Sequence, residues 1–341
     1  MTPIGPQQHP HKGRYAGKKT AAVLVVALLL TTALRGQDIH FSQLDVNPLL
    51  FNPAYAGFFD AMGRFGVAYR NQWASVSTPF QTITLTGEWN VFRSRKNYNS
   101  ISVGGWISTD RAGTLGYGST TASAIGSFFF SPTRDNDNFV SVAIEAGVGQ
   151  SGFSTQNIEL SESSESFSRT QAIYPLLGVG AAWFRQMSDV FYTKLGLSVR
   201  NINQPDISYS GFYDSRLARK YNIYARAEWR ATSQFGILPV VGWQRQSQFS
   251  ELLYGCDVRW YVRESSRDYL AFDAGVIGRH ADAAAINLAV EWLSWIFAFS
   301  YDINISTLAS ASHTIGAFEI GVVYKVIKQD PRKRALPCPI I

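Results

Sequence analysis

The stretch LLYGCDVRWYV, residues 252–262, decides the fold. One set of alternate residues is apolar or aromatic: Leu252, Tyr254, Cys256, Val258, Trp260 and Val262. The residues between them carry both charges of the stretch: Leu253, Gly255, Asp257, Arg259 and Tyr261. Successive side chains of a strand point to opposite faces. Strict alternation over this length therefore predicts a strand with one apolar and one polar face.

The same period-two pattern returns along the chain, in about fourteen runs. They lie near 63–71, 80–91, 99–109, 117–131, 138–150, 171–185, 190–201, 220–231, 235–245, 252–262, 269–279, 283–293, 295–306 and 315–327. Their lengths of about 10–15 residues exceed the roughly 5–6 that are usual in soluble proteins. They suit tilted strands that cross a bilayer, which need about 9–11 residues.

Alternating strands fit either a soluble sandwich or barrel, with the apolar face inward, or an outer-membrane barrel, with the apolar face toward lipid. The charged residues fall on the polar face, many of them mid-strand: Glu88, Glu145, Arg226, Glu228, Arg230, Asp257, Arg259, Asp273, Glu291, Asp302, Glu319 and Lys325. Tryptophans lie at or near the ends of the runs, as aromatic girdles require: Trp73, Trp106, Trp183, Trp243, Trp292 and Trp295. We therefore expect an all-β fold, a transmembrane antiparallel β-barrel of the outer membrane over residues 63–327.

The first 36 residues read as a signal peptide. Their basic start precedes the apolar run AAVLVVALLLTTAL, residues 21–34, which is shorter than the roughly 20 residues of a membrane-spanning helix. Cleavage after Gly36 would leave Gln37 first; the alternative is an uncleaved N-terminal anchor. The leader holds five of the 31 basic residues and no acid, so 26 basic residues remain against 25 acidic ones. This balance leaves no basic footprint for a nucleic acid.

The connections predict the orientation of the barrel. Both termini of such barrels are normally periplasmic, so the odd-numbered connections face outside and are longer. The longest ones, 150–170 and 202–219, are the fifth and the seventh. The tail, residues 328–341, is then periplasmic, and it contains the basic cluster Lys328, Arg332, Lys333 and Arg334. We expect the tail either to pair with anionic head groups or to contact a periplasmic partner.

No constellation of an enzyme, cofactor or metal site is found in the sequence. GVGQSG, residues 147–152, matches G-x-G-x-x-G, but a Ser- and Glu-rich loop follows where a dinucleotide site needs a helix. His40, His280 and His313 are widely separated. The carboxylates of the lumen are interpreted as partners of lumenal arginines such as Arg226 and Arg259. We expect a protein that is not an enzyme and has no cofactor.

The segment 37–62, before the first strand, contains HFSQLDVNPLLFNPAYAGFF at residues 40–59. Asn47 and Asn52 each precede a proline, which pushes them to extended geometry, and proline removes a donor that a sheet would use. The segment therefore cannot be another strand, although its leucines and aromatic residues require burial. We expect it to pack at the periplasmic mouth or to enter the lumen as a plug. It would then act as a stabilising latch or as a docking surface for a partner.

The motifs QDIHFSQLDVNPLLFNPAYAG and RFGVAYRNQW together resemble the PorP/SprF family of type IX secretion system membrane proteins. Further pieces follow in order: KLGLSVRNINQPDISYSG at 194–211, SYDINIS at 300–306, GAFEIGVVY at 316–324 and LPCP at 336–339. The chain ends on Pro-Ile-Ile where the family is expected to end on an aromatic residue.

The resemblance implies an exported outer-membrane protein of a Bacteroidota-type bacterium, active in protein secretion or gliding motility. It implies a non-enzymatic adaptor or anchor whose partners are outer-membrane lipid, periplasmic lipoprotein ring components and secreted cargo. The alternative is a general or substrate-specific porin. The residues that carry this hypothesis are His40, Phe41, Ser42, Gln43, Asn47, Pro48, Asn52, Pro53, Tyr55, Gly57, Arg70, Asn71, Gln72 and Trp73.

Overall fold

The computed structural model of the protein describes most of the chain from Phe41 to Ile327. The described ranges are 41–59, 61–72, 79–94, 99–112, 117–133, 137–153, 170–209, 215–265, 268–306 and 314–327. The predicted signal peptide, residues 1–36, and the basic tail, residues 328–341, lie outside them.

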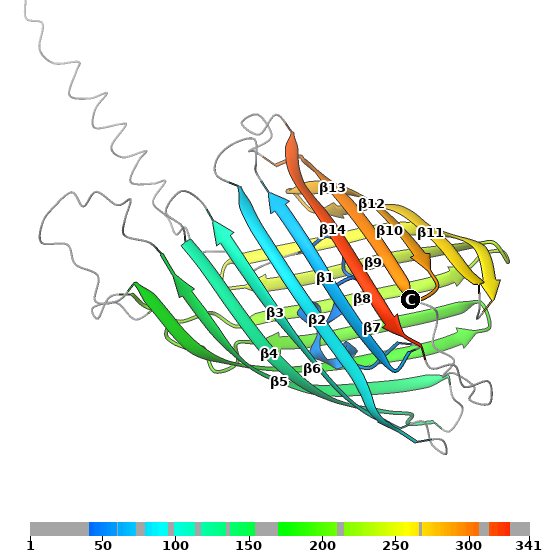
Figure 1. Cartoon of the computed structure of the whole chain (residues 1–341), viewed down its shortest axis with the longest axis horizontal. Coiled ribbons are helices and arrows are strands. Elements are labelled where there is room, and N and C mark those ends of the chain that lie inside the picture. Colours follow the sequence, from blue (N-terminus) through cyan, green and yellow to red (C-terminus); the bar gives the residue numbers. More distant parts are fainter. Residues whose placement is uncertain are drawn as a thin grey trace, which may run out of the picture. The chain divides into compact units, whose positions relative to one another are not determined.

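The described residues form a closed antiparallel barrel of fourteen strands (Figure 1). The strands are β1 (Gly63–Gln72), β2 (Phe80–Arg93), β3 (Ser100–Ala112), β4 (Tyr117–Phe130), β5 (Asn138–Gly152), β6 (Gln171–Ser188), β7 (Phe191–Arg200), β8 (Lys220–Arg230), β9 (Phe235–Gln246), β10 (Phe249–Ser265), β11 (Asp268–Arg279), β12 (Ala283–Trp292), β13 (Trp295–Asn304) and β14 (Ile315–Val326). Each strand pairs with the next one along the chain, and β1 pairs with β14 to close the sheet. The predicted strands are confirmed, with boundaries that differ by a few residues.

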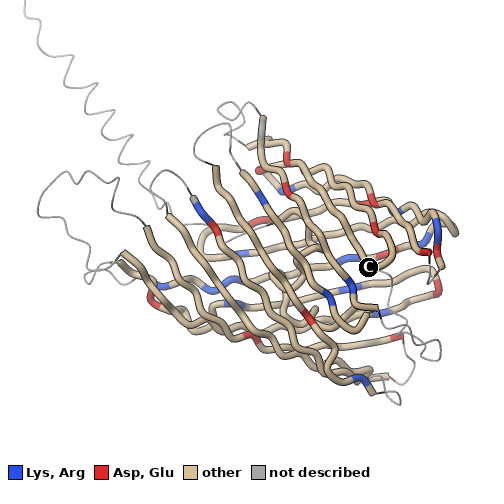
Figure 2. The backbone as a smooth tube through the Cα atoms, in the orientation of Figure 1, with Lys and Arg blue, Asp and Glu red and all other residues tan. Residues whose placement is uncertain are grey.

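The two faces of the strands follow the alternation in the sequence. In β10, Val258 is 45% exposed on the outside, whereas its neighbours Asp257 and Arg259 are 7% and 4% exposed on the inside. Figure 2 shows Lys, Arg, Asp and Glu spread along the strands rather than gathered at their ends. An apolar outer face with charges inside is the arrangement of a membrane barrel, not of a soluble one.

The ends of the barrel differ in their connections. At one end β1 begins and β14 ends; we call it the terminus end. At the other, the long-loop end, lie the connections 153–170 and 201–219. The connections 189–190 and 293–294 at the terminus end are short. Among the described residues, no helix is long and apolar enough to cross a membrane.

One of the predicted girdle tryptophans is placed elsewhere by the structure. Trp106 lies in the middle of β3, 8% exposed, and its indole Nε1 donates to Glu145 Oε1 at 2.9 Å inside the barrel. The expectation of an interfacial position was therefore wrong for Trp106. A buried indole N–H requires an acceptor, and Glu145 supplies it. Trp292 and Trp295 lie at strand ends, as predicted, and are 50% and 41% exposed. Trp73 lies outside the described residues.

Replacing Val258 by arginine is expected to impair barrel assembly. The substitution places a charge on the lipid face in the middle of β10, at a cost of about 2–4 kcal/mol near mid-depth. The measurement is the fraction of heat-resistant folded barrel on gels, with Val258→Leu as the control. Equal folding of the two variants would mean that this face does not contact lipid.

Candidate functional site

The segment 41–59 lies inside the barrel. It contains two short helices, α2 (Pro48–Phe51) and η1 (Pro53–Tyr55), which Figure 1 shows between the front and rear walls. A proline begins each helix, where its missing N–H costs nothing. Asn52 between them is extended, which interrupts the helix after one turn.

Asn52 attaches the segment to the wall. Its Oδ1 accepts the Ala54 N–H at 2.9 Å, an N-cap of η1. Its Nδ2 donates to Ala181 O in β6 at 2.9 Å and to Leu197 O in β7 at 3.2 Å. One amide therefore starts a helix and joins it to two neighbouring strands.

Two wall glycines make room for this contact. A Cβ on Gly180 would lie under 3.0 Å from Asn52 Oδ1 and the Pro53 ring. A Cβ on Gly196 would lie under 3.0 Å from Tyr55 Oη and Asn52 Nδ2. The glycines, which are unfavourable within strands, are explained by the segment they accommodate.

Arg200 satisfies the open carbonyl groups of α2. Its guanidinium donates to Leu49 O and Leu50 O, and Ser198 Oγ donates to Phe51 O at 2.6 Å. The last carbonyls of a helix have no partner within it, and a cation near them is favourable. Arg200 Nε also pairs with Glu145 Oε2 at 3.0 Å.

The apolar side chains of the segment face an inward patch of the wall. The ring of Phe58 stacks on Phe184 at 3.4 Å, and Tyr55 meets Phe184 and Tyr224 edge-on at 6.0 and 5.9 Å. Leu49 is fully buried in the same cluster. Burial raises the pKa of the Tyr55 phenol well above its usual range, so the hydroxyl stays neutral.

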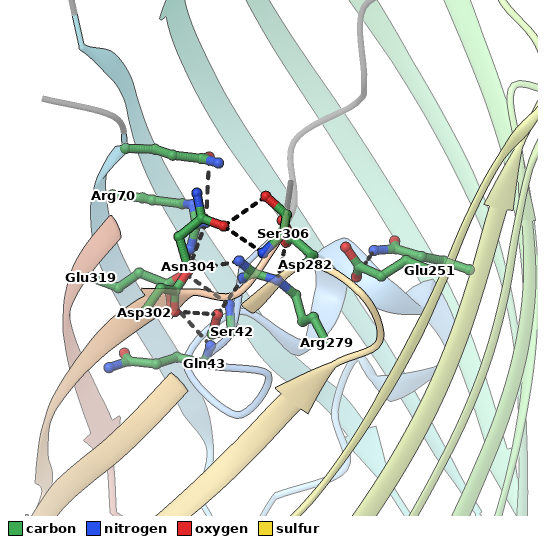
Figure 3. Close-up of polar contacts among 12 residues, drawn as sticks. Ser42, Gln43, Arg70, Glu251, Arg279, Asp282, Asp302, Asn304, Ser306 and Glu319 are labelled. Carbon is green, nitrogen blue, oxygen red and sulfur yellow. Dashed lines mark hydrogen bonds and ion pairs between the residues drawn. The ribbon is translucent and has the colours of Figure 1, made fainter. Parts of the chain in front are cut away.

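Ser42 and Gln43 are held at the long-loop end (Figure 3). The Glu319 carboxylate accepts their two backbone N–H groups at 2.8 and 3.0 Å. Ser42 Oγ donates to Asp302 at 3.0 Å and accepts from Arg279 at 2.7 Å. Arg70 pairs with Glu319 and, at 3.0 Å, with Asp302, which Arg279 also meets at 2.9 Å. We call this cluster the upper lock; it consists of Ser42, Arg70, Arg279, Asp302 and Glu319.

The segment is attached again at the terminus end. The Gly57 N–H donates to Glu88 Oε2 at 2.9 Å, and Arg64 pairs with Glu88 at 3.4 Å. Gly57 has a positive φ of 85°, which a glycine adopts without strain. Arg64 and Arg70, the β1 residues of the two attachments, are six residues apart, which is about 20 Å along a strand. The segment therefore runs along the lumen from one end toward the other rather than lying at one mouth.

Asp45 lies between the two attachments and pairs with Arg226. Burial alone would raise the pKa of the Asp45 carboxyl. The charges of Arg226, Lys194, Arg259 and Arg64 outweigh this effect and hold the pKa below its ordinary value. The carboxylate is therefore ionised at neutral pH.

This ion pair is expected to stabilise the protein at neutral pH and to lose that effect in acid. A carboxyl with a lowered folded-state pKa contributes fully above its ordinary value of 3.8, and its contribution disappears as the pH falls through the lowered pKa. Melting temperatures of the wild type and Asp45→Asn, measured in detergent against pH, should differ at neutral pH and converge in acid. A pH-independent difference would contradict this reasoning.

Arg259 in β10 lies at the centre of a group of ion pairs that joins β10 to β11 and β12 on the lumenal side. Its guanidinium meets the Asp273 carboxylate with two contacts of 2.7 Å and lies 3.7 Å from Glu291, which Lys325 also pairs. Two-point contact between guanidinium and carboxylate is the strong geometry for such pairs. The interpretation of lumenal carboxylates as partners of lumenal cations agrees with these contacts.

A loop that the sequence did not single out as a site covers part of the long-loop end. β6 extends beyond β7 there, and the Asn203 side chain pairs its free edge, accepting from Leu177 N at 3.2 Å and donating to Pro175 O at 2.8 Å. Ile207, Tyr209 and Leu217 pack on inward-facing residues of β6, namely Ala172, Tyr174 and Leu176. The alternation of Ile207 and Tyr209 within a polar loop was the signal available in the sequence.

These observations give a membrane barrel whose lumen contains its own N-terminal segment. The family model of the type IX secretion system membrane protein PorP/SprF matches residues 33–324. The chain belongs to the PorP/SprF family. Membership and fold together support an outer-membrane location.

Solved structures similar to this PorP/SprF chain are also barrels. A deltaS2S3 mutant of the monoaromatic hydrocarbon channel TodX has 9% identity and a TM-score of 0.50, over 82% of this chain and 94% of that one. The Ralstonia pickettii toluene transporter TbuX has 10% identity and a TM-score of 0.49, over 83% and 94%. At such identities the likeness concerns the fold alone. No curated protein sequence matches the chain.

The remaining residues of the family motifs are placed as follows. Phe41 packs with Val46, Ala68 and Val323. The Asn47 side chain is buried and caps no backbone N–H of α2. Gln72 Oε1 accepts from Arg70 at 3.4 Å, and Asn71 Nδ2 donates to Tyr69 Oη at 3.1 Å, away from the segment. His40 and Trp73 lie outside the described residues, as do Lys328, Arg332, Lys333 and Arg334 of the tail.

The described part of this PorP/SprF chain contains no group of His, Cys, Asp and Glu side chains that could hold a metal ion. Many of its lumenal carboxylates are engaged by arginines, lysines and backbone N–H groups. The arrangement is suited to holding one polypeptide segment against a wall.

Proposed function

We propose that this PorP/SprF protein is a non-enzymatic outer-membrane component of the type IX secretion or gliding machinery. It works with its lumen plugged by the segment 41–59 and serves as a barrel adaptor or anchor for cargo and periplasmic partners. The observation that carries the proposal is the attachment of this segment at both ends of the lumen. Leaving the lumen would strip the buried carboxylate of Glu319 of two backbone donors and uncover Leu49 and Tyr55.

The terminus end is the proposed docking surface. The Met62 N–H donates to Val326 O at 2.9 Å, so the residue before β1 lies beside the end of β14, which the tail follows in the sequence. A periplasmic partner, such as a lipoprotein ring component, would contact both elements at once. The segment can therefore serve both as a latch and as a docking surface. Its buried part fixes it in the lumen, and its end at the terminus end is available to a partner.

The partner role is tested by affinity purification from native envelopes. Deleting residues 329–341 should leave a folded barrel that no longer co-purifies with its periplasmic partner and no longer supports secretion. A full-length variant with Lys328, Arg332, Lys333 and Arg334 changed to glutamine separates the charge of the tail from its length. Normal secretion by the truncated protein would exclude docking by the tail. Failure to reach the outer membrane would assign the tail to assembly.

The second candidate is a porin or small-molecule transporter. It is favoured by the charge-lined lumen and by the barrel likeness to TodX, a monoaromatic hydrocarbon channel. Planar bilayers distinguish the two. Wild-type protein should show no large, steady conductance, whereas protein lacking residues 41–59 should conduct. Steady conductance of the wild type would favour the transporter.

A further inference from the structure

A groove of about 640 Å³ lies on the outer, lipid-facing wall of β6–β9. Its volume is in the range of small-molecule sites. The sides are apolar or aromatic: Val179, Leu197, Ile223, Tyr221 and Trp243. These side chains are separate from the lumenal site, because they belong to the opposite face of the same strands.

The groove has a local cause in the sequence. Ala181 is the small residue in a row of cross-strand neighbours, Ala181, Leu197, Ile223 and Trp243. The floor is therefore backbone and a methyl group, between larger residues. An apolar trough of this kind fits part of an acyl chain.

A cation lies at the end of the groove. Arg245 lines it, is exposed, and is opposite Tyr221 in the register of β8 and β9. It is one residue from the end of β9, at the long-loop end, where the hydrocarbon layer gives way to head groups. Its hydrogen bond within the described residues, from Nε to Ser247 O, is long at 3.4 Å. The guanidinium remains available to an anion.

We propose that this groove binds one membrane lipid with a phosphate head group. The acyl chain occupies the trough over Ala181, and Arg245 binds the phosphate. Arginine recognises phosphate with two parallel N–H donors. Tyr221 and Trp243, with apolar bodies and polar tips, occupy the interface beside it. A free phosphate would not use the trough, and in a zwitterionic head group the choline cation beside the phosphate would be repelled by Arg245. The occupant is therefore an anionic lipid.

Native mass spectrometry in mild detergent tests the site. The purified full-length barrel is titrated with phosphatidylglycerol or with phosphatidylcholine of the same acyl chains. One phosphatidylglycerol should be retained in preference to phosphatidylcholine, and an excess of inorganic phosphate should not displace it. Arg245→Gln should weaken retention about tenfold, as expected for loss of a charge-assisted contact. Ala181→Leu, which fills the trough, should weaken both lipids.

Matched controls separate this site from general lipid contact. Arg111→Gln removes another exposed arginine near the long-loop end, and Ala124→Leu enlarges another exposed alanine on the outer face. Neither should change retention. Equal retention of the two lipids, or equal losses in Arg245→Gln and Arg111→Gln, would mean annular lipid only and would overturn the proposal. Both test residues point away from the lumen, so their variants should keep the heat resistance of the folded barrel.

Discussion

Replacing Arg259 by leucine is expected to destabilise the barrel by about 3–5 kcal/mol, the range for removing one partner of a buried ion pair. The guanidinium is 4% exposed and engages both oxygens of Asp273 as well as Glu291. Without Arg259, the Asp273 carboxylate, which faces the lumen, has lost the cation that neutralises it. The measurement is the midpoint of urea unfolding in detergent or lipid vesicles.

The double variant Arg259→Leu/Asp273→Leu is the informative control. If the cost is the stranded charge, removing Asp273 as well should restore a large part of the stability, and a double-mutant cycle will show strong coupling. Glu291 keeps Lys325 as its partner in either case. Strictly additive losses would show that the pair with Asp273 does not account for the cost of losing Arg259.

The sequence alone predicts that Val258→Arg damages assembly more than Arg259→Val, since water or neighbouring side chains in the lumen can compensate for much of the lost charge. The structure changes this comparison. The segment 41–59 excludes much of the solvent from the part of the lumen that contains Asp257 and Arg259. The charged side chains beside them are therefore neutralised by these two residues rather than by water. The cost of a lumenal substitution therefore depends on whether the lumen is filled.

The strands and their faces could be predicted because lipid imposes them. Every backbone group within a bilayer must be paired, and only a closed sheet or a helix achieves this. The alternation in residues 252–262 then reads directly as lipid face and lumen face. The alternation along β3 would also have placed Trp106 on the lumen face, because Ser102, Gly104 and Ser108 lie on the same face of that strand.

The content of the lumen could be predicted only in outline. The two Asn-Pro units and the leucines between them showed that residues 37–62 needed burial and could not form a strand. They did not show which wall residues would hold the segment. Gly180, Gly196 and Arg200 look ordinary in their strands, and their role depends on pairings more than 120 residues apart. Such contacts have no local signal in one sequence.

The lumen and the outer wall share one constraint at β6 and β7. Gly180 and Gly196 admit Asn52 and Tyr55 on the inside, and Ala181 and Leu197 beside them line the groove on the outside. Strand pairing fixes the backbone here, so a larger side chain at such a position must displace what lies beside it rather than the wall.

Gly196→Val should therefore displace the segment while the barrel itself folds. The new Cβ would lie under 3.0 Å from Tyr55 Oη and Asn52 Nδ2, and overpacking of this kind costs about 1–3 kcal/mol. Valine favours a strand more than glycine does, so the substitution should not destabilise the wall itself. Asn52 would lose its bonds to Ala181 and Leu197, and the buried helices would be exposed.

Two measurements read this displacement: cleavage of the purified barrel within residues 41–59 by a protease, and conductance in planar bilayers. Both should rise in Gly196→Val. The matched control is Gly242→Val in β9, since a Cβ there has its nearest neighbour, Tyr224 Cδ2, at an ordinary 3.6 Å. Gly242→Val should keep the segment protected and the lumen closed. If Gly196→Val also stays protected and silent, the contact with Asn52 does not hold the segment, and the other attachments, around Ser42, at Gly57 and at Arg200, must do so.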